Sequence, residues 1–324
     1  MLSSEKISGQ LRTKWAARNI LYKDVTDSTN NDARKLSLEG APSGTLAVAD
    51  RQDAGRGSNG RGWETPAGSN IAMSLVLRPE IEPSKIPMLT LVMGLSVAEG
   101  IDQALKENCG ENESPKGFKK LFSIGNKSAA EGDVCCIKWP NDVVIDNKKV
   151  CGILTELHMA PQGKIDDAII GVGINVNMVD FPEAIKGVAG SLLTQTGRRV
   201  DRSLVVARVM ERFEENYEKF EKTSDLSLLR QQYERRLINR NRKVMILDPR
   251  KAARVADKDE VEQKFQNREG CDQVRPEGDI RPLDETGTCI GITELGALIV
   301  EMDSGVKRMV NAGEVSVRGI YGYV

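Results

Sequence analysis

Apolar residues recur along this chain with two periods, which separate strand-like stretches from helix-like ones. Alternating or continuously apolar runs predict strands at residues 44–52, 70–79, 134–140, 142–146, 148–159 and 167–177. Helical spacing predicts helices at 31–40, 84–108 and 201–237. Beyond about residue 240 only short strand patterns remain, at 242–247, 287–295, 296–302, 306–310 and 313–318. This order predicts an α+β fold, in which a mixed β-sheet with packed helices is followed by a small β-barrel.

Two stretches lack any period and divide these elements. Residues 109–133 are rich in Gly, Ser, Lys and Glu, and residues 249–284 are highly charged. Because the neighbouring strand patterns are complete without them, we expect both to be insertions. The chain then has an N-terminal extension at 1–20, a first domain at 21–238 that contains the first insertion, and a barrel domain at 239–324 that contains the second.

Turn and cap signals support these boundaries. Asp146 and Asn147 fit the tight turn of a β-hairpin. Ser28 and Thr29 are suited to cap the helix that follows them, and Gly40 is suited to end it.

The charge balance and the apolar runs narrow the class of protein. The 324 residues include 46 Lys and Arg against 47 Asp and Glu, so no general basic field favours nucleic acid. No uninterrupted apolar run reaches the about 18 to 20 residues of a membrane span, and the N-terminus lacks a secretory signal. We therefore expect a cytoplasmic protein with no nucleic-acid and no membrane partner. Arg12, Lys14 and Arg18 also fit an organelle transit segment, which Glu5 argues against.

The cysteines and the single histidine exclude several chemistries. The six cysteines are Cys109, Cys135, Cys136, Cys151, Cys271 and Cys289. They form no CxxC pair, which argues against a zinc site or a disulfide framework and favours reduced thiols in the core. His158 is the only histidine, so any Ser-His-Asp or Cys-His mechanism would depend on it. Because it lies in a strand-like run, we expect it to be structural.

The loop between the first two predicted strands has an unusual composition. Residues 55–63, GRGSNGRGW, contain four glycines and two arginines. Glycine-rich backbone can present several N–H groups in one direction, and arginine offers bidentate donors, which together suit phosphate or carboxylate. The pattern is neither a P-loop nor a dinucleotide-binding fingerprint. An ordinary surface loop and an RG-rich nucleic-acid contact stay open as alternatives.

Further motifs supply the context of this loop. In order, the chain contains STN at 28–30, QDAGRGSNGRGW at 52–63, KWPND at 138–142, KVCGIL at 149–154 and GVGIN at 171–175. With these motifs in this order, the chain resembles the biotin protein ligases over about residues 22–248 and 286–318. The resemblance implies a class II synthetase-like biotin/lipoate ligase catalytic domain followed by an SH3-like barrel.

The resemblance also implies a two-step reaction, with biotin as substrate and ATP and Mg²⁺ as cofactors. Biotin and ATP give biotinyl-5′-AMP and pyrophosphate, and a lysine of the biotin carboxyl carrier domain of a carboxylase then attacks the adenylate. A carboxylate repels the α-phosphate that it must attack, so fixed positive charge is needed where the two anions meet. About twenty residues precede the motifs, too few for a helix-turn-helix domain, which implies a monofunctional ligase. A homodimer is compatible with this interpretation.

Carried over position by position, the resemblance assigns the site residues. The catalytic group is Lys149, Arg56, Lys138 and Asp142. The biotin-binding group is Ser28, Thr29, Asn30, Gln52, Arg56, Gly57, Ser58, Lys149, Gly152 and Gly171. The group that binds ATP or the adenylate is Gly55, Arg56, Arg61, Trp63, Lys149, Asn175 and Arg318. No metal ligand is assigned, and Ser58 departs from the family pattern because many relatives have another arginine after GRG.

Alternative interpretations stay open from the sequence. Lipoate–protein ligases share the fold and the adenylation, although their histidine-bearing motif has no counterpart here. A biotin-responsive regulator that binds DNA is the alternative from a different class. Taken singly, Ser28 and Thr29 also fit a helix cap, Trp139 and Pro140 fit core packing, and Lys149 fits an ordinary hairpin lysine.

Overall fold

The structure is a computed structural model that describes residues 1–60, 62–108, 133–247, 285–312 and 316–319. The chain divides into two compact units. The first unit is Met1–Ile238 with Ile292–Gly296, and the second is Asn239–Gly291 with Ala297–Val324. The two predicted insertions lie outside the described residues, apart from Asp133. Each unit contains its own sheet.

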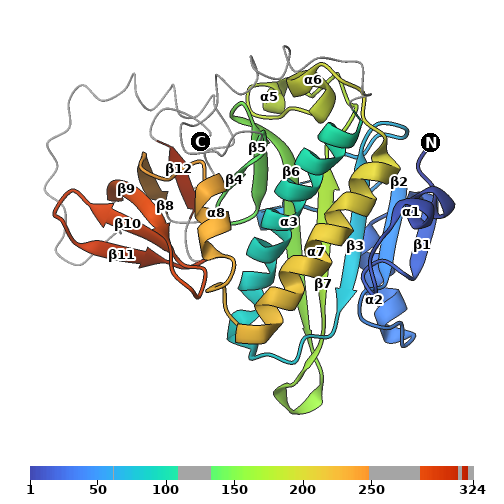
Figure 1. Cartoon of the computed structure of the whole chain (residues 1–324), viewed down its shortest axis with the longest axis horizontal. Helices are drawn as coiled ribbons and strands as arrows, with labels where there is room; N and C mark the ends of the chain where they lie inside the picture. Colours follow the sequence, from blue (N-terminus) through green and yellow to red (C-terminus); the bar gives the residue numbers. More distant parts are fainter. Residues whose placement is uncertain (61, 109–132, 248–284, 313–315, 320–324) are drawn as a thin grey trace, which may run out of the picture. The chain divides into compact units, whose positions relative to one another are not determined.

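A seven-stranded mixed sheet forms the centre of the first unit (Figure 1). Its strands are β1 (Ile20–Thr26), β2 (Leu46–Gln52), β3 (Ile71–Leu77), β4 (Cys136–Lys138), β5 (Asp142–Ile145), β6 (Lys148–Met159) and β7 (Ile165–Ile174), in the spatial order β1-β2-β3-β7-β6-β5-β4. β1 and β2 run parallel, and every other neighbouring pair is antiparallel. The β5–β6 hairpin turns at Asp146 and Asn147, whose φ angles of 47° and 62° confirm the predicted tight turn.

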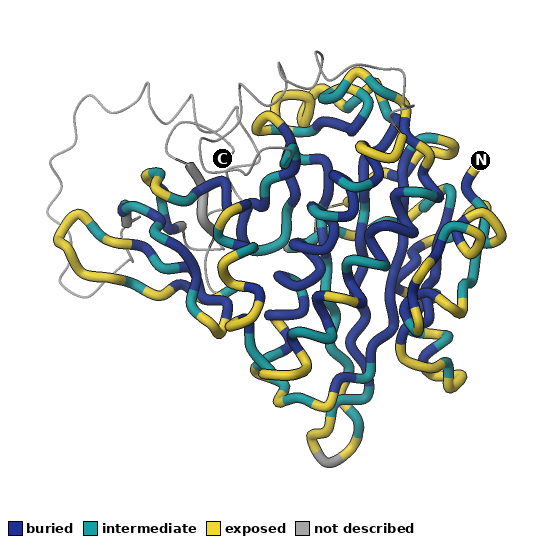
Figure 2. The backbone as a smooth tube through the Cα atoms, in the orientation of Figure 1, coloured by how far each residue is buried: buried dark blue, intermediate teal, exposed yellow. Residues whose placement is uncertain are grey.

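Helices cover both faces of this sheet. α3 (Ile86–Glu107) and α7 (Arg202–Thr223) pack against each other on one face, whereas α2 (Thr29–Leu38) lies on the other. The alternation of β6 shows this, because Thr155 contacts α3 while the next residue, Glu156, contacts α2. Figure 2 shows β3 and most of α3 as buried, which places the apolar core between the sheet and these helices.

α3 is apolar enough to raise the question of a membrane span. Within the described residues, Pro83–Glu107 is the one helical stretch with the length and composition to cross a membrane. However, 83% of its most apolar window is buried inside the structure, because the helix packs between α7 and the sheet. This packing is that of a core helix.

The predicted N-terminal extension packs into the first unit. It contains α1 (Ser4–Gln10), which contacts α7, and its loop at 14–16 donates three backbone N–H groups to the carboxylate of Glu214 on α7. Sequence periodicity missed both α1 and β1. The other helical elements in the described part of this unit are η1 (Ser58–Gly60), η2 (Pro83–Lys85), η3 (Pro161–Gly163), α5 (Glu183–Lys186), α6 (Leu192–Thr196) and α8 (Arg230–Arg236).

The second unit contains a five-stranded sheet, consistent with the predicted SH3-like fold. Its strands are β8 (Lys243–Leu247), β9 (Glu285–Ile292), β10 (Leu298–Met302), β11 (Lys307–Val310) and β12 (Ser316–Gly319), in the order β11-β10-β9-β8-β12. Each matches a strand expected from the sequence, because short apolar runs between turns are a local signal.

Candidate functional site

A pocket lies on the α2 face of the sheet, beside the start of α2 and the glycine-rich loop. Its lining residues are Ser28, Thr29, Asn30, Gln52, Arg56, Gly57, Ser58, Trp63, Ala72, Asn141, Lys149, Gly152, Ile153, Leu154, Gly171, Val172 and Gly173. All ten residues assigned to biotin binding from the sequence are among them. Segments from all five motifs therefore meet in one place.

One end of the pocket is built from neutral polar groups around the first turn of α2. Thr29 donates to Oε1 of Gln52 through its backbone N–H at 2.8 Å and its hydroxyl at 3.0 Å. The hydroxyl of Ser74 on β3 lies 2.7 Å from Oγ1 of Thr29 and 2.6 Å from Oδ1 of Asn30. Ser28 occupies the N-cap position, but its side chain makes no cap hydrogen bond. The simple cap interpretation of Ser28 therefore leaves its hydroxyl unexplained.

Three glycines on β6 and β7 make room for the side chains that line the pocket. A Cβ at Gly171 would overlap the amide oxygen of Asn30, and one at Gly173 would overlap the indole ring of Trp63. At Gly152 it would lie 2.9 Å from the Trp63 ring and 3.1 Å from Nζ of Lys149. Close approach to the sheet surface therefore requires glycine at these positions.

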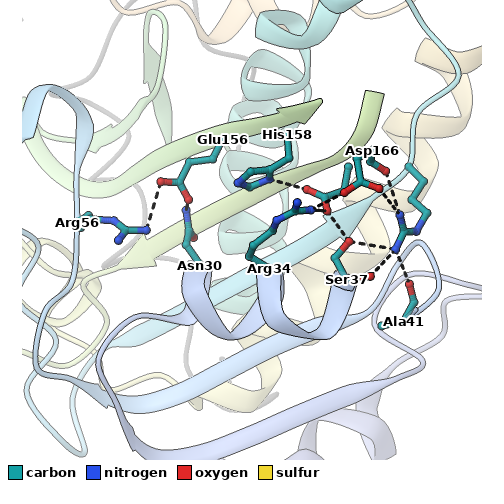
Figure 3. A network of polar contacts seen from close by, with 10 residues as sticks. Asn30, Arg34, Ser37, Ala41, Arg56, Glu156, His158 and Asp166 are labelled. Carbon is teal, nitrogen blue, oxygen red and sulfur yellow. Dashed lines mark hydrogen bonds and ion pairs between the residues drawn. The ribbon is translucent and has the colours of Figure 1, made fainter. Parts of the chain in front are cut away.

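The described lining contains two charged side chains, both cationic, and each has a carboxylate partner outside the lining. Nζ of Lys149 lies 2.6 Å from Oδ1 of Asp142 on β5. Nη2 of Arg56 lies 3.3 Å from Oε1 of Glu156 (Figure 3). The same nitrogen lies 2.9 Å from Oδ1 of Asn31. Two cations at one pocket can attract an anionic ligand, and their partners hold them in place before it arrives.

The glycine-rich loop folds back on itself at the pocket. The backbone N–H of Trp63 donates to the carbonyl of Gly55 at 2.9 Å, and Arg56 forms an isolated β-bridge with Gly62. The Trp63 ring lies against the sheet, with Nζ of Lys149 5.5 Å from its centroid. The loop thus brings an aromatic ring and a guanidinium group to the same pocket.

Several residues predicted for the site do not line this pocket. Lys138 is buried on β4, and Gly55 lines a second hollow, formed by residues 51–55 and 62–66. The amide of Asn175 accepts from Asn70 at 3.2 Å and donates to the carbonyl of Gly190 at 3.0 Å. Its observed contacts thus position the 188–190 segment, which also bonds to the backbone of Lys149.

Two further assignments cannot be placed. Arg61 lies outside the described residues, and Arg318 lies on β12 in the second unit, where the structure describes its backbone alone.

Sequence reasoning missed Asn141, Gly173 and Glu156. The first two belong to the KWPND and GVGIN motifs, so their motifs could have indicated them. Asn141, in the turn between β4 and β5, donates to the carbonyl of Ile153 at 3.1 Å and so joins this turn to β6. Glu156 gave no signal, because its contact with Asn30 spans 126 residues of sequence.

His158 and the described cysteines fit structural roles. Nδ1 of His158 lies 2.6 Å from Oδ1 of the fully buried Asp167, which Arg34 and Ser37 of α2 also contact (Figure 3). Cys135, Cys136, Cys151 and Cys289 are free thiols. Burial raises the pKa of the Cys151 thiol, which disfavours the nucleophilic thiolate beside the pocket.

Two family models match the sequence. Residues 22–175 match the Biotin/lipoate A/B protein ligase family, and residues 281–318 match the Biotin protein ligase C terminal domain. The first of these matches contains the pocket, since all of its lining residues lie between positions 28 and 173.

The chain is similar to curated bacterial proteins. It is 38% identical over 218 residues to the bifunctional ligase/repressor BirA of Bacillus subtilis, a match that covers 67% of this chain and 59% of that protein. It is 35% identical over 181 residues to the biotin--[acetyl-CoA-carboxylase] ligase of Paracoccus denitrificans, covering 54% of this chain and 63% of that one. The chain therefore spans less than two thirds of the length of these relatives.

A solved structure has a similar fold. The biotin protein ligase of Aquifex aeolicus, in complex with biotin and ATP, superposes with a TM-score of 0.64 at 28% identity. The match covers 93% of this chain and 99% of that one.

Proposed function

Because the chain belongs to the biotin protein ligase family, we propose that it activates biotin with ATP as biotinyl-5′-AMP and transfers the biotinyl group to a lysine of a biotin carrier domain. The observation that carries this proposal is the pocket itself, in which a neutral polar end and two partnered cations meet on a glycine-lined sheet surface.

In the first step, a carboxylate oxygen of biotin attacks the α-phosphorus of ATP, and pyrophosphate leaves. Both reactants are anions, so the step is slow unless preorganised positive charge lies between them. Lys149 and Arg56 are the described cations of the pocket lining and are suited to this role. Asp142 holds the ammonium group of Lys149 at 2.6 Å, which fixes the charge before the ligands bind.

In the second step, the neutral amine of the carrier lysine attacks the acyl carbon of the mixed anhydride. AMP leaves, the nitrogen loses a proton, and an amide bond forms. The glycine-rich loop would shield the anhydride from water until the carrier arrives, because Trp63 and Arg56 both reach the pocket from it.

The polar end of the pocket suits the ureido ring of biotin. This ring carries one carbonyl acceptor and two N–H donors, which hydroxyl and amide side chains can match without introducing charge. Ser28, Thr29 and Gln52 supply such groups around the start of α2. Gly171, on the sheet beneath, leaves space next to Asn30.

We propose that Mg²⁺ enters with the ATP phosphates. Mg²⁺ commonly binds through one or two carboxylates together with substrate phosphates. Among the described residues, no group of three His, Cys, Asp or Glu side chains could hold an ion, whereas Asp142 could supply a single carboxylate next to Lys149. The ion would neutralise part of the phosphate charge.

Carrier domains of biotin-dependent carboxylases are the proposed protein partners. The name of the Paracoccus relative supports this choice, and the match of residues 281–318 to a biotin protein ligase domain favours biotin over lipoate. A cytoplasmic location and the absence of nucleic-acid and membrane partners stay predictions of the sequence.

The test is to incubate the purified chain with labelled ATP and either biotin or lipoate, and then to add a carrier domain. We expect labelled biotinyl-AMP, followed on addition of the carrier by release of labelled AMP and by a biotinyl group on one carrier lysine, and no lipoyl-AMP. Formation of lipoyl-AMP alone would favour the lipoate alternative, and formation of neither adenylate would overturn the proposal.

A further inference from the structure

Glu156 occupies a place next to the pocket that the proposed reaction does not yet use. It lies on β6, two residues before His158, and both side chains are on the face of the sheet that α2 covers (Figure 3). Its side chain is 31% exposed and does not line the pocket. Its two carboxylate oxygens contact two different residues that do, Asn30 and Arg56.

The first contact fixes the orientation of the Asn30 amide. Oε2 of Glu156 accepts from Nδ2 of Asn30 at 2.7 Å, while Ser74 lies 2.6 Å from Oδ1 of the same amide. An ionised carboxylate can only accept hydrogen bonds, so it must face the NH₂ end of the amide. Because Gly171 packs against Asn30 on the sheet side, the amide is held on three sides.

The second contact holds the glycine-rich loop. Oε1 of Glu156 lies 3.3 Å from Nη2 of Arg56, whose other partner is Asn31 of α2 at 2.9 Å. One carboxylate therefore joins the first turn of α2 to the loop that carries Arg56. The Arg56 side chain is 47% exposed, so the ion pair is weak enough for a phosphate to replace it.

We propose that Glu156 is a positioning residue for ligand binding at this pocket. It orients the Asn30 amide toward the ring of biotin and holds Arg56 at the pocket rim between ligand-binding events. This inference rests on the proposed function and adds to it a residue that binds neither biotin nor ATP directly.

Two variants separate the two roles. Glu156→Gln removes the charge but keeps an acceptor for Asn30, whereas Glu156→Ala removes both. Without ligand, trypsin should cut after Arg56 up to about fivefold faster in Glu156→Gln than in wild type. Loss of an exposed ion pair shifts a local opening equilibrium by no more than about this factor. The dissociation constant for biotin should change by less than about twofold. In Glu156→Ala, cleavage should speed up likewise, and the dissociation constant for biotin should also rise about fivefold, because the buried amide of Asn30 loses one hydrogen bond.

Asp166→Asn is the matched control. Asp166 is 34% exposed and pairs across the same interface, with Nη1 of Arg34 on α2 at 2.8 Å, but the structure gives it no contact with Asn30 or Arg56. Biotin binding by calorimetry, tryptic cleavage at Arg56 by mass spectrometry and the thermal midpoint are measured for all three variants. We expect Asp166→Asn to change the thermal midpoint but neither biotin binding nor cleavage at Arg56.

The outcomes separate the proposals. Equal effects of Asp166→Asn and Glu156→Ala on biotin binding would reduce Glu156 to a general stabilising residue, and unchanged binding and cleavage in Glu156→Ala would also overturn its assigned role. If the wild type fails to form biotinyl-AMP, the proposed function fails. Cleavage at Arg56 without ligand still tests the contact of Glu156 with the loop.

Discussion

Nζ of Lys149 lies 2.6 Å from Oδ1 of Asp142, across the β5–β6 hairpin and beside the Trp63 ring. The pair is partly buried, with 25% of the lysine side chain and 13% of the aspartate side chain exposed. Partial burial makes the charge interaction stronger than on an open surface, and the hairpin fixes its direction. A hairpin lysine in this arrangement can be preorganised for an anion.

If Lys149 stabilises the charge that develops during adenylate formation, Lys149→Met should slow that step. Loss of one preorganised donor costs about 10²- to 10³-fold in comparable sites. The measurement is the single-turnover rate of biotinyl-AMP formation from labelled ATP. Lys164→Met, at an exposed position in the β6–β7 connection, is the control and should react at the wild-type rate. A Lys149→Met protein as fast as this control would rule out the assigned role.

Gly173→Ala should disrupt the pocket, because the added methyl group would overlap the Trp63 ring. We expect loss of biotin binding and a shift in tryptophan emission while the chain remains folded. Gly94→Ala on α3 is the matched control, since the nearest atom to its new methyl group would be Cδ1 of Ile153 at 3.7 Å. It should bind biotin normally and gain about 0.5–1 kcal/mol, the usual gain when alanine replaces glycine inside a helix. Unaltered biotin affinity in Gly173→Ala would contradict this packing.

The pairing of Glu107 with Arg208 should make stability depend on pH. Hydrogen bonding from Arg208 lowers the pKa of Glu107 from its ordinary 4.5. A lowered folded-state pKa stabilises the protein above the unfolded-state pKa, and this stabilisation is lost as pH falls through the folded-state value. Glu107→Gln should therefore melt below wild type at pH 7, and the difference should vanish in acid.

Thermal melts of wild type and Glu107→Gln between pH 7 and pH 3 measure this difference. Glu39→Gln is the control, because its pair with Lys35 is 4.0 Å long and both side chains are mostly exposed. It should match wild type across the range. If the melting temperature of Glu107→Gln stays below that of wild type by the same amount down to pH 3, charge pairing is not the cause of the difference.

Arg236→Met should strongly destabilise the first unit. Nη1 of Arg236 lies 2.6 Å from Oδ2 of Asp102, and the two side chains are 5% and 3% exposed. Removing one partner of such a pair costs about 3–5 kcal/mol, because a buried charge remains. Burial already raises the pKa of Asp102. Adding Asp102→Asn should recover part of the loss, which urea unfolding would measure. A free energy of unfolding for Arg236→Met within about 1 kcal/mol of the wild-type value would contradict this account.

The sequence by itself determined most of the elements, though not α1 and β1, and most of the pocket. Strand period and turn residues are local properties, so they predicted β2 to β12 to within a few residues, including the Asp146-Asn147 turn. The motifs located Ser28, Gln52 and Lys149, because each belongs to a short contiguous pattern that can be recognised without knowing its neighbours.

Only the tertiary structure decided which side chains meet. Asn175 belongs to a recognised motif, yet its amide bonds to Asn70 and Gly190, contacts set by where β7 ends. Glu156 belongs to none of the recognised motifs, and its partners Asn30 and Arg56 lie 126 and 100 residues away. Hydrogen bonds of this kind depend on strand order and on which face of the sheet each residue points to. Those properties arise from the packing of the whole unit, so no local pattern carries them.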